Sequence, residues 1–200
     1  MIQHFGLTDI RQQIPITRIQ FVPEFLASHE IEAIQKLTNG LQVIEGKILH
    51  KNEELTMPMR HSQIKIIESN DQTSWIYQKI ANKVYELNKN NWQFDLFDIN
   101  EFLQYTEYAH VDSHRGHFDW HMDIADQGIA SNRKLTFECI LDDNHTGGEF
   151  SILLGHREHK VKMNLGDAVI FPSFYMNKVY PVLSGKRTSI VSWIAGPSFV

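Results

Sequence analysis

The sequence contains a single cysteine, Cys139, among its 200 residues, which excludes an internal disulfide. A lone thiol is typical of a reducing compartment, so we expect a cytoplasmic protein. No apolar run approaches the roughly 20 residues that cross a bilayer. The first residues also lack the basic and apolar regions of a signal peptide. With a net charge of −5, the chain provides no basic field for nucleic acid. We therefore expect neither membrane nor nucleic-acid partners.

Two apolar stripes with helical spacing lie in the first half of the chain. They predict one helix that Ser28 caps and Asn39-Gly40 ends, and a second helix over residues 73–87. Short strands are expected at 14–21, before the first helix, and at 41–49 and 63–67, between the two. The stripe residues are Ile31, Ile34 and Leu37 in the first helix, and Ile76, Ile80, Val84 and Leu87 in the second.

From residue 94 onward, short runs of β-forming residues alternate with turn signals such as Gly147-Gly148 and Ser184-Gly185. This spacing predicts a mainly β protein with flanking helices, an α+β arrangement in which N-terminal helices pack on one sheet of a double-stranded β-helix, or jelly roll. We expect a single domain over 1–200, with a buttress at 1–93 and the jelly-roll core at 94–200. The predicted strands are 101–108, 116–124, 134–141, 149–153, 160–163, 168–172, 178–183 and 188–194.

The most informative stretch lies at residues 116–123, Gly-His-Phe-Asp-Trp-His-Met-Asp. In a regular strand, His117, Asp119, His121 and Asp123 would share one face, where a histidine and a carboxylate two residues apart can bind one metal ion. Such a pair commonly supplies two ligands of a 2-His-1-carboxylate iron site. Solvated histidines also cluster by chance. A third triplet, His110-Val-Asp112, lies beside a polar segment better suited to a loop, and spacing alone does not choose between the other two.

An ordered set of motifs resembles the iron- and 2-oxoglutarate-dependent oxygenases of the prolyl 4-hydroxylase type, the PKHD-type hydroxylases. The resemblance extends over residues 15–198 and is more specific than any one motif. It implies that His121 and Asp123 are the ligands in residues 116–123. The other motifs are Arg60 with Ser62, Trp75-Ile-Tyr77, Leu87-Asn88, residues 92–96, Tyr105 to Tyr108, residues 133–136, Gly147-Gly-Glu-Phe150, Gly166 to Ser173 and Val179-Tyr-Pro-Val182.

By resemblance, the protein is a dioxygenase that uses Fe(II), 2-oxoglutarate and dioxygen, with ascorbate as a candidate cofactor. Arg187 would bind the distal carboxylate of 2-oxoglutarate as a bidentate partner. Tyr108, or alternatively Tyr105, would donate a hydrogen bond to the same molecule, and strand parity allows only one of them to line the pocket. The expected reaction is hydroxylation of an unactivated C–H bond in a peptide, protein or small molecule, with a prolyl residue as one candidate. Residues 50–60 and 109–115 are the expected substrate loops.

One position departs from the family pattern. Asn177 stands where a second histidine ligand is expected, and no histidine follows His159. Asn177 could bind metal through its amide oxygen, a weaker donor than imidazole. Alternatively, His117 could replace the missing ligand, or the asparagine could be an artificial replacement. The rival function is a catalytically degenerate jelly-roll binding protein. A further rival, a sugar-binding or isomerase-like cupin with another divalent ion, would leave Arg187 unexplained.

Overall fold

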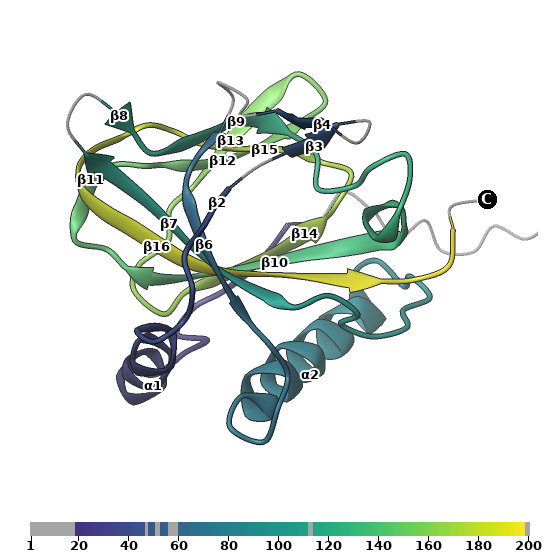
Figure 1. Cartoon of the computed structure of the whole chain (residues 1–200). Coiled ribbons are helices and arrows are strands. Elements are labelled where there is room, and N and C mark those ends of the chain that lie inside the picture. The colour runs from purple at the N-terminus through teal and green to yellow at the C-terminus, as the bar shows by residue number, and fades with distance from the viewer. Residues whose placement is uncertain (1–18, 47, 51–52, 56–59, 112–113, 199–200) are drawn as a thin grey trace, which may run out of the picture.

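The computed structural model describes residues 19–46, 48–50, 53–55, 60–111 and 114–198. Two antiparallel sheets face each other, and both helices pack on the outer face of the larger sheet (Figure 1). This arrangement confirms the predicted α+β jelly roll. The predicted residues Ile14 and Ile16 of the opening strand lie outside the described residues.

The larger sheet has nine strands in the order β1-β14-β10-β16-β7-β6-β2, with β11 paired to β16 and β8 paired to β7. Because β1, β2 and β6 come from the N-terminal half, this sheet extends across residue 94, the expected start of the core. The bounds are β1 Gln20–Val22, β2 Ile44–Glu45, β6 Gln63–Ile67, β7 Leu103–Val111, β8 His114–Arg115, β10 Arg133–Asp142, β11 His145–Gly147, β14 Ala168–Pro172 and β16 Val182–Ala195.

The smaller sheet has five strands in the order β13-β12-β15-β9-β5. A separate hairpin, β3 with β4, lies near it in Figure 1. The bounds are β5 Arg60–His61, β9 His117–His121, β12 Phe150–Leu154, β13 Arg157–Val161 and β15 Met176–Val179 for the sheet, and β3 Ile48–His50 and β4 Glu53–Leu55 for the hairpin.

The helices α1 (Ser28–Thr38) and α2 (Ser74–Asn90) pack their apolar stripes on the larger sheet. The stripe predicted for α1 is wrong at Leu37, which is only half-buried, whereas Thr38 is buried. The predicted cap of the first helix is wrong, because Ser28 is its first helical residue and Ala27 precedes it. The carboxylate of Glu30 instead accepts a hydrogen bond from the backbone nitrogen of Ala27 at 2.8 Å, which satisfies a donor at the helix start.

Side-chain alternation along β10 separates two cores. Leu135, Phe137 and Cys139 pack in the cluster shared with the helices. Thr136 and Glu138 point to the opposite face, where they line a cavity between the two sheets. A second apolar cluster between the sheets includes Phe150, Ile152, Val169, Phe171 and Val179. The space between the sheets is therefore where polar side chains of the core come together.

Several predicted strand limits are wrong; the strand expected at 160–163, for example, is β13, which already begins at Arg157. The turn expected at Ser184-Gly185 does not interrupt β16, because Gly185, with φ +71°, pairs there with His145 of β11. The strand expected at 178–183 falls on two strands, because β15 ends at Val179 and β16 begins at Val182. The strand expected at 116–124 ends at His121, after which Asp123 donates its backbone hydrogen to the carbonyl of Ser173. A short 3-10 helix, η1 (Ile129–Asn132), then leads into β10.

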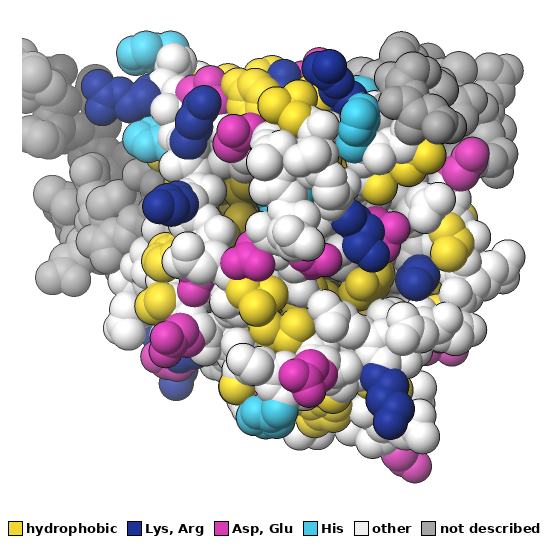
Figure 2. Space-filling view, turned by 90° about the vertical axis from the view of Figure 1, so that its left-hand side faces the viewer, with side chains coloured by type: hydrophobic (Ala, Val, Ile, Leu, Met, Phe, Trp, Pro, Cys, Tyr) yellow, Lys and Arg dark blue, Asp and Glu magenta, His cyan; other side chains and the backbone are white. Residues whose placement is uncertain are grey.

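Figure 2 shows the side of the molecule that lies at the left in Figure 1. Acidic and basic side chains are interspersed over its coloured part, with histidines at several separate places. Charges of both signs are thus mixed on this face and form no patch of one sign. Among the described residues, no helix is long and apolar enough to span a bilayer.

Candidate metal centre

The site lies at the end of β9, where pairing with β15 is irregular. Asn177 of β15 pairs with His121 of β9, and Val179 pairs with Phe118. The two pairs are two residues apart on β15 but three residues apart on β9. This extra residue is a bulge, and it places Phe118 and His121 on the same face. Their rings stack with centroids 3.3 Å apart. The expected alternation, which puts all four acidic and histidine residues of the stretch on one face, is therefore wrong.

The bulge divides the four predicted candidates. His121 and Asp123 line a cavity between the sheets, together with Asn177. Asp119 instead accepts a hydrogen bond from the Lys178 ammonium at 2.8 Å, and this contact holds the pKa of its carboxyl below the usual value. His117 pairs in register with His61 of β5, and its Nδ1 lies 2.7 Å from the carbonyl of Arg115. His117 does not line the cavity, so it is not brought to the place of the missing ligand.

The ring of His121 is oriented by a backbone carbonyl. Its Nδ1 lies 2.7 Å from the carbonyl oxygen of Asp119, so Nδ1 carries the proton and Nε2 has the free lone pair. Burial lowers the pKa of the imidazole. Nε2 lies 3.8 Å from Oδ1 of Asp123. Ligand atoms each about 2.1 Å from an ion can be at most about 4.2 Å apart, so one ion can contact both.

The other oxygen of Asp123 is fixed by two donors. Oδ2 accepts a hydrogen bond from the Thr136 hydroxyl at 2.9 Å and another from Nδ2 of Asn177 at 3.1 Å. The carbonyl of Asp123 also accepts a bond from the guanidinium of Arg133 at 2.8 Å. These contacts leave Oδ1 as the oxygen that faces His121. Hydrogen bonds of this kind typically orient a carboxylate that binds a metal ion through its other oxygen.

Asn177 serves as a hydrogen-bond donor in this arrangement. Besides Asp123, its Nδ2 lies 3.4 Å from the carbonyl of His121. Both partners are acceptors, so the NH2 end of the amide must face them, and an NH2 group is not a metal ligand. Among the described residues, no group of three or more histidine, cysteine, aspartate or glutamate side chains is placed to hold a metal ion. The donors thus fit a divalent ion with two protein ligands, His121 and Asp123.

The expected co-substrate residues lie deeper, on the larger sheet. Arg187 is 1% exposed, and its guanidinium donates to Oε1 of Glu138 at 2.9 Å. Tyr108 lines the cavity and pairs with Arg187 in register, and burial raises the pKa of its phenol. Tyr105 packs on the helix side of the sheet, as the parity argument required of one of the two tyrosines. The cation expected to bind 2-oxoglutarate already has a carboxylate partner within the chain.

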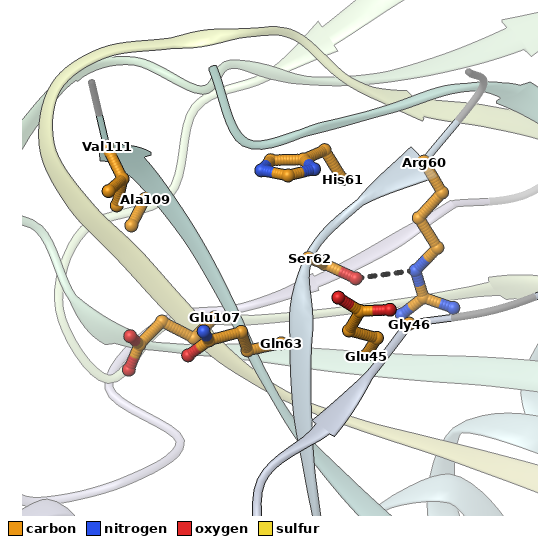
Figure 3. Close-up of a pocket in the computed structure, with 9 residues that line it drawn as sticks. All are labelled: Glu45, Gly46, Arg60, His61, Ser62, Gln63, Glu107, Ala109 and Val111. Atoms are coloured by element: carbon orange, nitrogen blue, oxygen red, sulfur yellow. Dashed lines mark hydrogen bonds between the residues drawn. The ribbon is translucent and has the colours of Figure 1, made fainter. Parts of the chain in front are cut away.

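A wider groove adjoins this cavity through Arg60, which lines both. The groove has a volume of about 330 Å³, and Figure 3 shows Arg60, His61, Ser62 and Glu45 around it. Nε of Arg60 donates to the Ser62 hydroxyl at 2.7 Å, and its guanidinium lies 4.6 Å from the Phe118 ring centroid. Described parts of the expected substrate loops line the groove, whereas residues 51–52, 56–59 and 112–113 lie outside the described residues.

Several site residues were not predicted from the sequence, namely Thr136, Glu138, Phe118 and Arg133. Thr136 and Glu138 did leave a signal, since they are polar residues two positions apart in the apolar run at 135–141. Polar side chains on one face of a buried strand indicate a polar interior site. The role of Phe118 depends on the bulge, which side-chain alternation cannot predict.

Comparisons with known proteins give one matching family and several relatives. Residues 103–195 match a family model described as the 2OG-Fe(II) oxygenase superfamily. The chain is 35% identical over 66 residues to a PKHD-type hydroxylase of Alteromonas mediterranea, a match that covers 33% of this chain and 29% of that protein. It is 22% identical to the PKHD-type hydroxylase YbiX of Escherichia coli over 86% of this chain and 76% of that protein. Like the Alteromonas protein, several other curated PKHD-type hydroxylases are matched over less than two fifths of their own length.

Solved structures share the fold. A prolyl-4-hydroxylase of Pseudomonas putida superimposes with a TM-score of 0.69 at 16% identity, covering 91% of this chain and 94% of that one. A prolyl hydroxylase of Trichoplax adhaerens, solved with a peptide fragment of hypoxia inducible factor, gives a TM-score of 0.70 at 15% identity over 88% of this chain and 83% of that one. The family model, the curated relatives and the shared fold agree: the chain is similar to the 2OG-Fe(II) oxygenase superfamily over residues 103–195, and to PKHD-type hydroxylases.

Proposed function

We propose that the protein is a metal-dependent oxygenase that hydroxylates an unactivated C–H bond, with the metal ion bound by His121 and Asp123. The observation that carries this proposal is the approach of two ligand atoms, Nε2 and Oδ1, to 3.8 Å on the wall of a buried cavity. The family implies Fe(II), 2-oxoglutarate and dioxygen for such a site. Tyr108 lines this cavity, and Arg187, its partner across β7 and β16, would lie beside it at the co-substrate end.

The chain's own residues prepare the ligands. The contact to the Asp119 carbonyl fixes the tautomer of His121, and its lowered pKa keeps the imidazole neutral at neutral pH. Thr136 and Asn177 hold Asp123 so that one oxygen remains directed at the ion. A bound iron ion would supply the activation of dioxygen, in which one oxygen atom enters the substrate C–H bond and the other enters the carboxylate formed when a 2-oxo acid loses carbon dioxide.

The groove beside the cavity is the proposed binding site of the substrate that is hydroxylated. Its volume of about 330 Å³ falls within the roughly 300–1,000 Å³ of small-molecule sites, and Arg60 joins it to the cavity that contains His121. Structures named as prolyl hydroxylases share the fold, and one of them is described with a peptide bound. We therefore propose a peptide or protein segment as the substrate, with a prolyl residue as the first candidate.

A second candidate function is a binding protein that has lost catalysis. The amide of Asn177 favours it, because its NH2 end faces Asp123 where the family pattern has a third ligand. A site with two protein ligands binds iron more weakly than one with three. Both functions predict the same fold, and they differ in metal binding.

The test is an anaerobic Fe(II) titration of the wild-type protein and its His121→Ala variant, followed by measurement of iron-dependent carbon dioxide release from 2-oxo acids in air. His156→Ala is the matched control, since His156 is exposed on the turn between β12 and β13. We expect His121→Ala to lose iron binding and His156→Ala to retain it. A wild-type protein that binds no iron would contradict the oxygenase proposal and favour the binding protein.

A further inference from the structure

Two histidines outside the metal centre are neighbours on the smaller sheet. His61 of β5 and His117 of β9 are direct partners where these two strands pair. The adjacent pair, Arg60 with Phe118, lines the cavity between the sheets. Because successive side chains of a strand point to opposite faces, both imidazoles lie on the outer face of the sheet, and neither lines that cavity.

The spacing of this histidine pair suits a single metal ion. Direct partners on antiparallel strands have Cβ atoms about 4.5–5.5 Å apart. Two imidazole nitrogens that bind one zinc ion, each at about 2.1 Å, are at most about 4.2 Å apart. Each ring extends beyond its Cβ and can turn toward the other strand, so both rings can reach an ion placed between them.

A hydrogen bond to the backbone sets the tautomer of His117. Its Nδ1 lies 2.7 Å from the carbonyl oxygen of Arg115, and since a carbonyl only accepts, Nδ1 carries the proton. Nε2 is then the nitrogen whose lone pair can bind a metal ion. His121 makes the same contact, with its Nδ1 2.7 Å from the carbonyl of Asp119. Histidines that bind metal ions commonly donate their other ring N–H in this way.

A carboxylate on this side of the sheet adds negative charge near the pair. Asp119 follows His117 by two residues, and its Oδ1 accepts hydrogen bonds from Lys178 and from the backbone nitrogen of Trp120, both at 2.8 Å. The pKa of the Asp119 carboxyl is lowered mainly by the Lys178 bond and further by the charge of a protonated His117, so Asp119 is within electrostatic reach of a cation there. Over the described ranges, no third histidine, cysteine, aspartate or glutamate completes a metal site. The pair would therefore be an open site, with water in the other positions.

The donor set indicates which metal the pair would prefer. Imidazole suits zinc, copper and nickel, whereas carboxylate, carbonyl and water ligands suit magnesium, calcium and manganese. Zinc binds nitrogen ligands in tetrahedral geometry and carries out no redox chemistry. The metal centre at His121 and Asp123 offers one nitrogen and one oxygen, so the two sites differ in the ions that they favour.

We propose that His61 and His117 form a second metal site, which binds Zn²⁺ and links β5 to β9. In the described part of the chain, two residue pairs join these strands, and β5 itself is Arg60–His61. An ion held by both imidazoles adds a further link between them. Arg60 lines both the groove and the cavity, so an occupied site also fixes part of the wall of each. The proposal does not depend on the oxygenase function, because the two sites share no ligand.

The test titrates Zn²⁺ by calorimetry into His121→Ala, in which the first centre lacks its histidine. We expect this protein to bind Zn²⁺, and its affinity to fall at least tenfold when either His61→Ala or His117→Asn is added. The asparagine amide can still donate to the Arg115 carbonyl but provides no imidazole. His156→Ala, on the exposed turn between β12 and β13, is the matched control and should leave the affinity of His121→Ala unchanged. If His121→Ala does not fold, the same changes are compared in the wild type, where they should remove one of two bound ions.

Hydrogen exchange measures the link between the strands. Zn²⁺ should slow amide exchange at least threefold in the peptide that contains Arg60 and His61 of His121→Ala, and should have no such effect once His61→Ala is added. Absence of Zn²⁺ binding, equal affinity with and without the two histidines, or binding that leaves exchange at β5 unchanged overturns the inference. None of these results affects the oxygenase proposal, which is tested by iron binding at His121.

Discussion

Asn177 donates a hydrogen bond to Oδ2 of Asp123 at 3.1 Å, and this contact places an amide where the family pattern has an imidazole. The backbone position is suited to a ligand, because Asn177 is the direct partner of His121 across the two strands and faces the same cavity. For a metal ion bound by His121 and Asp123, the side chain at 177, and not the strand, would limit the number of protein ligands.

The first prediction concerns Asn177→His. An imidazole at this position adds a third protein ligand, so iron affinity should rise about tenfold or more, measured by anaerobic Fe(II) titration. Asn177→Ala is the comparison, and it should bind iron more weakly than the wild type because Asp123 loses a donor. Equal or weaker binding in Asn177→His would show that the residue does not face the ion.

The second prediction concerns Thr136→Val. The hydroxyl of Thr136 holds Asp123 at 2.9 Å and also contacts the hydroxyl of Ser173 at 3.0 Å. Removing a group that orients a metal ligand typically costs 10- to 100-fold in affinity, so we expect at least a tenfold loss in the iron titration.

The control for this prediction is Thr106→Val on β7, a strand of the same sheet that β16 separates from β10. Among the described residues, the Thr106 hydroxyl is buried and has no hydrogen-bond partner. Its removal should leave iron binding unchanged and keep the free energy of unfolding within about 0.5 kcal/mol of the wild-type value, or raise it. An equal loss of iron affinity in both variants would mean that Thr136 acts only through general packing.

The regular parts of the molecule were predictable from local sequence patterns. The stripes of α1 and α2 follow from side-chain periodicity, because burial on one face imposes that period on the sequence. The strand at 168–172 follows from a continuous apolar run, because all of its residues are buried. The pair His121 and Asp123 was identified by resemblance. Local periodicity could not separate it from His117 and Asp119, since all four residues share one parity in a regular strand.

The features that decide the chemistry depend on contacts between distant segments. The bulge between Phe118 and His121 is set by pairing with β15, more than 50 residues away along the chain. The pair of Glu138 with Arg187 joins residues 49 positions apart. Neither leaves a periodic signal, so nothing in the sequence indicated that Arg187, expected by resemblance to bind 2-oxoglutarate, also pairs with Glu138. Only the fold brings Glu138 to it.

The third prediction concerns Gly116, which lies between β8 and β9 against the backbone of β7. A Cβ there would be 2.6 Å from the nitrogen of Ala109 and 2.8 Å from backbone atoms of Tyr108. Backbone atoms cannot move aside as a side chain can, so Gly116→Ala should lower the free energy of unfolding by about 2–3 kcal/mol, measured by urea denaturation.

Gly40→Ala is the control, because a Cβ at Gly40 meets nothing within 4 Å. Its free energy of unfolding should stay near the wild-type value or rise by up to about 1 kcal/mol, as the unfolded chain loses freedom. Similar stabilities for the two variants would mean that the segment around Gly116 shifts away from Tyr108.

The fourth prediction concerns Cys139, whose side chain is fully buried in the core shared with the helices. Burial, with the charges of Glu138 and Asp167, raises the pKa of the thiol well above its ordinary value. The folded protein therefore keeps the proton, whereas the unfolded chain releases it above about pH 8.5. Because the unfolded state binds fewer protons at high pH, the free energy of unfolding should fall by up to about 1.4 kcal/mol per pH unit above that value.

The measurement is urea denaturation between about pH 7 and 10 for the wild type and Cys139→Ala. The variant loses some stability at every pH through its cavity, but it should lack the part of the pH dependence that comes from the thiol. The difference in stability between the two proteins should thus be constant below about pH 8.5 and become smaller above it. A thiol reagent should label Cys139 only after denaturant is added. A constant difference up to pH 10, or rapid labelling of the native protein, would show that the thiol reaches solvent in the folded state.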